Sequence, residues 1–276
     1  MRTRISIAIA ALFLFISTEA LALPFARVGI RPETATQRNR IIADGGTIID
    51  LNFTNTFIRR TKELGIYTSC KFLGDANMAY KQGATGVTTF YDKSGTGNDL
   101  VQGTAINQPT WTAGQQNGRA GIVFDGSRWV AKTLVAAVDM PFTIISVSKV
   151  TTFEDYGIVY AATGSAGPQL FSFVAPSLSL SDGSTVATGI TTTQYDLITT
   201  EWNGATSKLA VNGAAYSNVN VGTNHSSATA LSIGAYTTPA YGLKGGVTSL
   251  FLFSGSLTTA QKVAMENLVN SYYQIY

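Results

Sequence analysis

The feature that most constrains the fold is a long series of short apolar or β-branched runs, which begins at Val87 and is broken by turn residues. Runs this short and this closely spaced are typical of an all-β sandwich or barrel, whereas βαβ units would alternate with longer helical patterns. The dipeptides Asn203-Gly204 and Asn212-Gly213 favour hairpin turns, because both residue types tolerate positive φ. We expect strands over residues 87–91, 120–125, 128–134, 142–150, 156–162, 169–174, 185–190, 195–202, 207–212, 229–235 and 246–254.

Two of these runs lack the alternation of a half-exposed strand. Residues 143–150 (TIISVSKV) and Leu250–Phe253 are apolar or β-branched almost throughout, which predicts central strands buried on both faces. Trp202 lies in another strand pattern, and we expect it in the core. Only 13% of the residues are charged, against about a quarter in an average soluble protein. Glycine, serine, threonine and tyrosine take their place, which suits strands and polar turns.

The segment before residue 87 predicts a smaller α/β unit. Residues 23–39 contain two prolines and read as an extended arm, and Asp44-Gly45-Gly46 indicates a hairpin or another sharp turn. An amphipathic helix is expected over roughly 51–64, with Gly65 just beyond its end. Strands are expected over 66–72 and from residue 79, and a domain boundary near residues 83–86.

The chain closes on a predicted helix. Thr258 is a candidate N-cap, and Gln261 three residues later completes a capping box. Apolar residues then recur at helical spacing from Ala264 to Tyr272. We expect this helix to pack across one end or edge of the sandwich.

The first 22 residues predict an export signal. Arg2 and Arg4 precede an apolar run over residues 5–16, and Ala20-Leu21-Ala22 resembles a cleavage site. Twelve apolar residues are too few for a membrane-spanning helix. Alternatives are a membrane anchor or a buried element that is retained. An exported protein, extracellular or at the cell surface, is therefore expected.

Charge and chemistry exclude several classes of function. The net charge is only +3, without a run of Lys or Arg, so a nucleic-acid partner is not expected. Cys70 is the single cysteine, which excludes an internal disulfide, and a buried thiol is the main expectation, with a reactive or intermolecular thiol as the alternative. The single histidine, His225, lies in a polar loop, and one His with one Cys cannot form a zinc site or a nucleophile pair unless the two meet.

A set of motifs links this chain to a known fold. They are residues 91–99 (YDKSGTGND), Gln108-Pro109, 123–127 (VFDGS), 200–204 (TEWNG), 208–213 (KLAVNG) and 243–253 (LKGGVTSLFLF). In this order, they resemble the concanavalin A-like lectin/glucanase superfamily, in particular its laminin-G-like (LamG) domains, over about residues 87–276. The resemblance implies an antiparallel jelly-roll β-sandwich. Residues 38–46 and 62–67 more weakly resemble segments that precede such domains in bacteriophage virion proteins.

Candidate binding residues follow from what sugars need: flat aromatic faces together with converging amide, carboxylate and backbone groups. The candidates for a glycan site are Asn98, Asp99, Trp111, Arg128, Trp129, Tyr236 and Tyr241. Many relatives of this fold bind calcium, and Asp92, Asn98, Asp99 and Asp125 are the candidates for such a site. For Asp92 and Asp125 a capping role in their turns is the competing interpretation.

Three functions stay open on the sequence. The first is a non-catalytic module that binds a glycan or cell-surface polysaccharide in adhesion. The second is a structural protein of a virion or surface assembly, with other subunits docked through residues 23–64. The third is a glycoside hydrolase, which needs two carboxyl groups roughly 5–10 Å apart. Residues 91–102 also resemble a segment of fungal arabinofuranosidases, but the available carboxylates match no catalytic motif: Glu154, Asp155, Asp182, Asp196 and Glu201.

Overall fold

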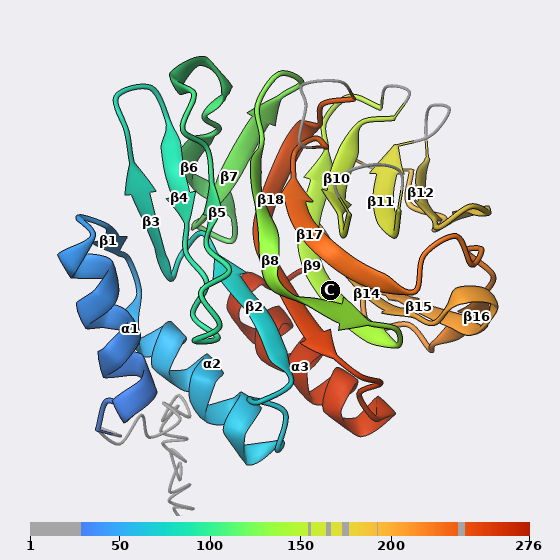
Figure 1. Ribbon diagram of the computed structural model, residues 1–276, viewed down its shortest axis with the longest axis horizontal. Helices are drawn as coiled ribbons and strands as arrows, with labels where there is room; N and C mark the ends of the chain where they lie inside the picture. Colours follow the sequence, from blue (N-terminus) through green and yellow to red (C-terminus); the bar gives the residue numbers. More distant parts are fainter. Residues whose placement is uncertain (1–28, 154–155, 164–166, 173–176, 192, 237–240) are drawn as a thin grey trace, which may run out of the picture. The chain divides into compact units, whose positions relative to one another are not determined.

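The computed structural model describes residues 29–153, 156–163, 167–172, 177–191, 193–236 and 241–276. Arg31–Tyr276 form one compact unit built mainly of antiparallel strands (Figure 1). None of the helices in this part of the chain is both long and apolar enough to span a membrane. The predicted export signal at residues 1–22 lies outside the described residues.

Ten strands of the described chain form one antiparallel sheet, which we call sheet A. In pairing order they are β1 (Thr47–Ile48), β3 (Ala79–Gln82), β4 (Val87–Phe90), β5 (Leu100–Val101), β8 (Val130–Asp139), β17 (Ser227–Ile233), β10 (Ile158–Ala161), β11 (Gln169–Ser172), β12 (Leu178–Ser181) and β13 (Thr185–Ala187). The domain boundary expected near residues 83–86 falls in the turn between β3 and β4, which pair with each other in this sheet.

Eight further strands form sheet B. Seven follow one another in the order β16 (Ser217–Val219), β15 (Ser207–Val211), β14 (Asp196–Trp202), β9 (Phe142–Val150), β18 (Lys244–Ser254), β7 (Arg119–Asp125) and β6 (Thr110–Gln116). The eighth, β2 (Cys70–Asp75), pairs with the second half of β18, while β7 pairs with its first half. The strand β18 therefore joins the N-terminal segment to the rest of the sandwich.

The main core lies between the two sheets. On β9, Ile144 faces this core, while Ile145 and Val147 face the opposite side of sheet B. The prediction of a strand buried on both faces is thus confirmed, and the same holds for Leu250–Phe253 on β18. Trp202 is 1% exposed, as expected. Each large side chain buried in this way contributes about 1.5–3 kcal/mol.

Helices α2 (Leu51–Glu63) and α3 (Thr259–Tyr273) cover the outer face of sheet B. Phe57 of α2 and Met265 of α3 are fully buried in one cluster with Phe251 of β18. Both predicted helices and the capping box of α3 are confirmed. However, α3 lies on the face of sheet B instead of at its end or edge, because its apolar stripe pairs with the outward side chains of β9 and β18.

The prediction of an extended arm over residues 23–39 is wrong for its described part. Helix α1 (Pro32–Ala43) begins with Pro32 in its first turn, where a missing N–H costs nothing. Its sequence is mostly polar, and only Thr34, Gln37 and Ile41 are buried, so it shows little apolar periodicity. The sharp turn at Gly45 is present, with φ at 78°, and it joins α1 to β1.

Several strand limits also differ from the prediction. The residues expected to begin the strand over 66–72 form a turn, in which the N–H groups of Ser69 and Cys70 donate to Ile66 and Tyr67, and the strand starts only at Cys70. The Asn-Gly hairpins are confirmed: Asn203 and Gly204 lie between β14 and β15, and Asn212 and Gly213 between β15 and β16. Five short or exposed strands were not predicted, namely β1, β5, β6, β12 and β16.

Candidate functional site

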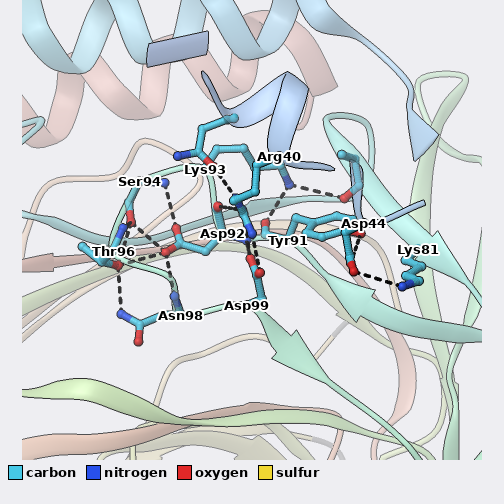
Figure 2. A network of polar contacts seen from close by, with 12 residues as sticks. Arg40, Asp44, Lys81, Tyr91, Asp92, Lys93, Ser94, Thr96, Asn98 and Asp99 are labelled. Carbon is cyan, nitrogen blue, oxygen red and sulfur yellow. Dashed lines mark hydrogen bonds and ion pairs between the residues drawn. The ribbon is translucent and has the colours of Figure 1, made fainter. Parts of the chain in front are cut away.

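The glycine-rich loop, residues 92–99, is organised around the buried carboxylate of Asp92 (Figure 2). Its Oδ1 accepts hydrogen bonds from the N–H groups of Leu73 and Ser94, at 2.9 and 2.8 Å. Its Oδ2 accepts from the Ser94 hydroxyl, the Thr96 hydroxyl and the Asn98 N–H, at 2.8 to 3.1 Å. A carboxylate with two oxygens has about four lone-pair sites. The single Thr96 proton is shared with the Lys71 carbonyl, which accepts it at 2.7 Å, but the other four donors already fill these sites and leave Asp92 no capacity for a ligand.

Helix α1 reaches this loop through Arg40. Its guanidinium binds both carboxylate oxygens of Asp99, at 2.5 and 3.1 Å, and donates to the Asp92 carbonyl at 2.7 Å (Figure 2). The same arginine lies 5.5 Å from the ring centroid of Tyr91, whose hydroxyl donates to Asp44 at 2.6 Å. That hydrogen bond, followed by one from Lys81, lowers the pKa of Asp44. The network thus fastens α1 to sheet A.

Three of the four candidate calcium ligands meet in this loop, but their oxygens already have partners. Asn98 accepts from the Val135 N–H at 2.9 Å and donates to the Lys71 carbonyl at 2.8 Å. Asp125 instead ends β7, where it accepts from Ser127 and pairs with Arg128. The capping interpretation of Asp92 and Asp125 matches these contacts. In the described ranges no group of three His, Cys, Asp or Glu side chains is placed to hold a metal ion.

Lys93 is fully buried, and its ammonium lies 5.5 Å from the ring centroid of Phe90. Its ammonium donates to Tyr91 at 2.7 Å and to Ala79 at 3.3 Å. Burial lowers its pKa to about 8, although the charges of Asp75 and Asp92 act in the opposite direction. The side chain lines a cavity of about 10 Å³ between α1, α2 and sheet A, which is room for about one water molecule. This space is too small for an organic ligand.

The two candidate tryptophans lie apart from the glycine-rich loop. Trp111 on β6 is half-buried, stacks on Tyr80 with the ring centroids 5.1 Å apart, and donates from Nε1 to the Ala76 carbonyl at 2.9 Å. Trp129 is also half-buried, and its backbone bonds to Asn107 and Gln102. Stacking and hydrogen bonding give Trp111 a structural role.

Three tyrosines meet at the end of the sandwich where β10 and β18 begin and β17 ends (Figure 1). We call Tyr156, Tyr236 and Tyr241 the tyrosine cluster. The ring centroids of Tyr156 and Tyr241 lie 5.2 Å apart, and those of Tyr236 and Tyr241 lie 5.9 Å apart. Tyr241 is 50% exposed and Tyr156 is 39% exposed. The sequence predicted Tyr236 and Tyr241 as binding residues, and the structure adds Tyr156 beside them.

The backbone of this cluster is strained. Tyr156 has a φ of 64° and Tyr241 a φ of 69°, in the left-handed region that favours glycine. For an L-residue with a Cβ this conformation costs roughly 1–2 kcal/mol. Such strain persists only where the surroundings enforce it, and it concentrates at functional sites. Two exposed aromatic residues in this conformation, in contact with each other, mark the cluster as a candidate binding site.

Polar groups lie next to the tyrosine cluster. The hydroxyl of Tyr236 donates to the Gln169 side-chain carbonyl on β11. Gly242 packs so closely on Gly126 that a Cβ at residue 242 would lie 1.9 Å from the Gly126 carbonyl oxygen. The turn that carries Arg128 therefore adjoins the backbone of Tyr241. The guanidinium of Arg128, however, donates to the Gln108 carbonyl at 3.0 Å and to the Thr110 hydroxyl at 3.2 Å. Of the candidate glycan residues, Tyr236 and Tyr241 therefore meet here, whereas Asn98 and Asp99 lie in the α1 network.

At the opposite end of β17, His225 forms a pair with Asp182. Asp182 is 1% exposed, and its carboxylate accepts from the ring Nδ1 of His225 at 2.6 Å and from its backbone N–H at 3.2 Å. The pair fixes the imidazole ring and ties the turn after β12 to the segment before β17. The sequence analysis missed it, because the two residues are 43 positions apart and no motif joins them.

The other described carboxylates considered for hydrolysis also have protein partners. Glu201 is paired with Lys262 of α3 at 2.6 Å, with both side chains almost fully buried. Asp196 accepts from Asn212 at 2.7 Å, and burial raises its pKa. Glu154 and Asp155 lie outside the described residues. Glu201 is therefore a structural residue that holds α3 to sheet B.

The sequence matches no known family model and no curated protein. Solved structures with a similar fold exist. One is a GH54 α-L-arabinofuranosidase variant soaked with 4-nitrophenyl α-L-arabinofuranoside, with a TM-score of 0.55 at 12% identity. The similarity extends over 79% of this chain and 65% of the enzyme chain. An arabinofuranosidase complexed with arabinofuranosyl-α-1,2-xylobiose has a TM-score of 0.53 at 13% identity, covering 72% and 52%.

A third similar structure is the binding domain of Paraclostridial Mosquitocidal Protein 1, with a TM-score of 0.52 at 11% identity. The similarity extends over 75% of this chain and 53% of that domain. The chain thus spans between about half and two thirds of the length of these three solved chains. At such low identities the similarity establishes the fold alone, a two-sheet antiparallel β-sandwich, and membership of the lectin/glucanase superfamily stays a prediction. The more specific LamG assignment stays a prediction.

Proposed function

We propose that this protein is a non-catalytic recognition module that binds a glycan at the tyrosine cluster. The observation that carries the proposal is the pair of exposed, mutually contacting rings of Tyr156 and Tyr241, both held in left-handed backbone. Exposed aromatic faces stack on the C–H surfaces of sugars, and nearby amides and charged groups bind the hydroxyls. The turn at residues 125–128, in which Asp125 and Ser127 are exposed, adjoins the backbone of Tyr241 and can supply such groups.

The fold supports the same class of ligand. One solved structure of similar fold holds arabinofuranosyl-α-1,2-xylobiose, and loops at one end of a rigid sandwich are common sites for recognition. A hydrolase receives less support, because Glu201 and Asp182 are each committed to a basic partner within the protein. Export is part of the proposal, and it depends only on the sequence of residues 1–22.

A glycan array on the full chain tests the proposal, with and without calcium. We expect saturable binding to one class of glycan. Tyr241→Ala should weaken it at least about tenfold, which corresponds to a loss of about 1.4 kcal/mol in binding free energy. Tyr276→Ala is the matched control, because Tyr276 is also 50% exposed but lies after α3 and outside the tyrosine cluster. Its binding should equal that of the unmodified chain.

Other outcomes would change the proposal. Loss of binding in Trp129→Ala but not in Tyr241→Ala would move the site to the turn that precedes β8. A folded sample that binds no glycan would overturn the proposal in favour of an assembly protein, with residues 23–64 as the segment to test for a partner.

A further inference from the structure

The rings of the tyrosine cluster are not coplanar. The planes of Tyr156 and Tyr241 are tilted by 58° to each other, and those of Tyr236 and Tyr241 by 87°. Sugar rings stack with their C–H face parallel to the aromatic plane. Two rings tilted in this way cannot both lie flat against sugar faces that share one plane.

Contacts hold the ring of Tyr156 and the backbone of Tyr241. Tyr156 stacks in parallel on the buried Phe171, with the planes 8° apart, and its N–H donates to the Ser172 carbonyl at 2.7 Å. The Tyr241 carbonyl accepts from the Ile158 N–H at 3.0 Å.

The third ring and the close backbone packing add to this rigidity. Tyr236 is held by its hydrogen bond to Gln169, and the approach of Gly242 to Gly126 leaves the backbone after Tyr241 no room to shift toward the turn at residues 125–128. A preorganised surface of this kind selects ligands by shape, because rearrangement would cost binding free energy.

From this geometry we infer that the cluster binds a soluble glycan that is bent or presented by its chain end, and not the flat face of a crystalline polysaccharide. This inference rests on the proposed function. A crystalline surface presents many sugar faces in one plane, so it contacts one ring only. A bent chain or a chain end offers two faces at an angle, and it contacts Tyr156 and Tyr241 together.

Binding of the full chain to two kinds of probe tests the inference. The first kind is microcrystalline cellulose and crystalline chitin in pull-down assays. The second is the soluble oligosaccharide that gives the strongest array signal, measured by titration calorimetry. We expect at least about tenfold tighter binding to the soluble probe.

The single variants Tyr156→Ala and Tyr241→Ala sharpen this test. Tyr241→Ala should weaken binding of the soluble probe at least about tenfold and Tyr156→Ala at least about fivefold, while Tyr276→Ala leaves it unchanged. Equal or tighter binding to the crystalline polysaccharides, or loss of affinity in only one of the two variants, overturns the inference and leaves the glycan function standing. Absence of binding to every array glycan overturns the proposed function and the inference with it.

Discussion

The glycine-rich loop and the tyrosine cluster hold their side chains in opposite ways. In the loop, Asp92 is buried and every contact of its carboxylate is with the protein itself. In the cluster, Tyr156 and Tyr241 are exposed and their backbone is strained. The motif that stands out most in the sequence therefore serves the stability of the fold. The residues best placed to meet a ligand lie in a part of the sequence with no evident motif.

The largest effect is expected from Asp92→Asn. Whichever way the amide turns, its NH₂ would face at least one backbone N–H, either that of Asn98 or those of Leu73 and Ser94, while the hydroxyls of Ser94 and Thr96 can rotate to accept. Unsatisfied buried donors cost about 1–3 kcal/mol each, so we expect a loss of about 3 kcal/mol in the free energy of unfolding, measured by urea denaturation. Asp139→Asn, at an exposed position on β8, should change it by less than about 0.5 kcal/mol. If glycan affinity of the folded protein fell as well, the two regions would not be independent.

A pH-dependent effect of about 2 kcal/mol is expected from Lys93. Its pKa is lowered by burial to about 8 in the folded protein, against about 10.4 in an unfolded chain. Between these values the unfolded state binds more protons, so the free energy of unfolding rises with pH. Below pH 8 both states are protonated and the full cost of burying the charge is present.

Urea denaturation at pH 7.5 and 9.5, compared with Lys93→Met, isolates this contribution. The unmodified chain should gain about 2 kcal/mol relative to the variant over this interval, since each pKa unit corresponds to about 1.4 kcal/mol. Equal slopes for both proteins would show that Lys93 keeps an ordinary pKa.

At the tyrosine cluster, the comparison of Tyr241→Gly with Tyr241→Ala measures strain and function separately. Glycine adopts a φ of 69° without a Cβ clash, whereas alanine keeps the clash. We expect the glycine variant to be more stable than the alanine variant by about 1 kcal/mol, by thermal or urea denaturation. Both variants lack the ring, so both should bind glycan at least about tenfold more weakly. An alanine variant as stable as the glycine variant would mean that no strain is stored there.

A similarly small effect on stability is expected from Arg40→Lys. Lysine cannot make the bidentate contact with Asp99 and also reach the Asp92 carbonyl. Because the Arg40 side chain is 36% exposed, solvent screens this pair, and we expect a loss of only about 1 kcal/mol. Arg38→Lys on the exposed side of the same helix is the control. Unchanged stability in Arg40→Lys would show that apolar packing alone holds α1.

The sequence predicted the sandwich well wherever local patterns determine structure. Residues 143–150 gave a doubly buried strand, Asn212-Gly213 a hairpin, and Thr258 with Gln261 a capped helix. Helix α1 was missed because its buried face contains Thr34 and Gln37 and shows little apolar periodicity. Its position depends on the tertiary contact of Arg40 with Asp99, which no local pattern reveals.

The candidate site was predicted only in part, for a similar reason. Tyr236 and Tyr241 are close in sequence and could be proposed together, but Tyr156 joins them through pairing of β10 with β17 and a bridge from Ile158 to Gly242. The pairing of His225 with Asp182 likewise arises from two separate loops. Contacts between distant segments follow from sheet topology, and a single sequence does not specify them.

The arrangement of β18 has a consequence for how the chain folds. This strand pairs with β9, β7 and β2, and its Ser249 hydroxyl bonds to the buried Asp75, 174 positions earlier in the chain. During synthesis, the edges of β2, β7 and β9 that pair with β18 therefore stay unpaired until residues 244–254 have left the ribosome. Long-range pairing of this kind slows folding and exposes the chain to aggregation. Sheet B is thus expected to form only once residues 244–254 are free to pair.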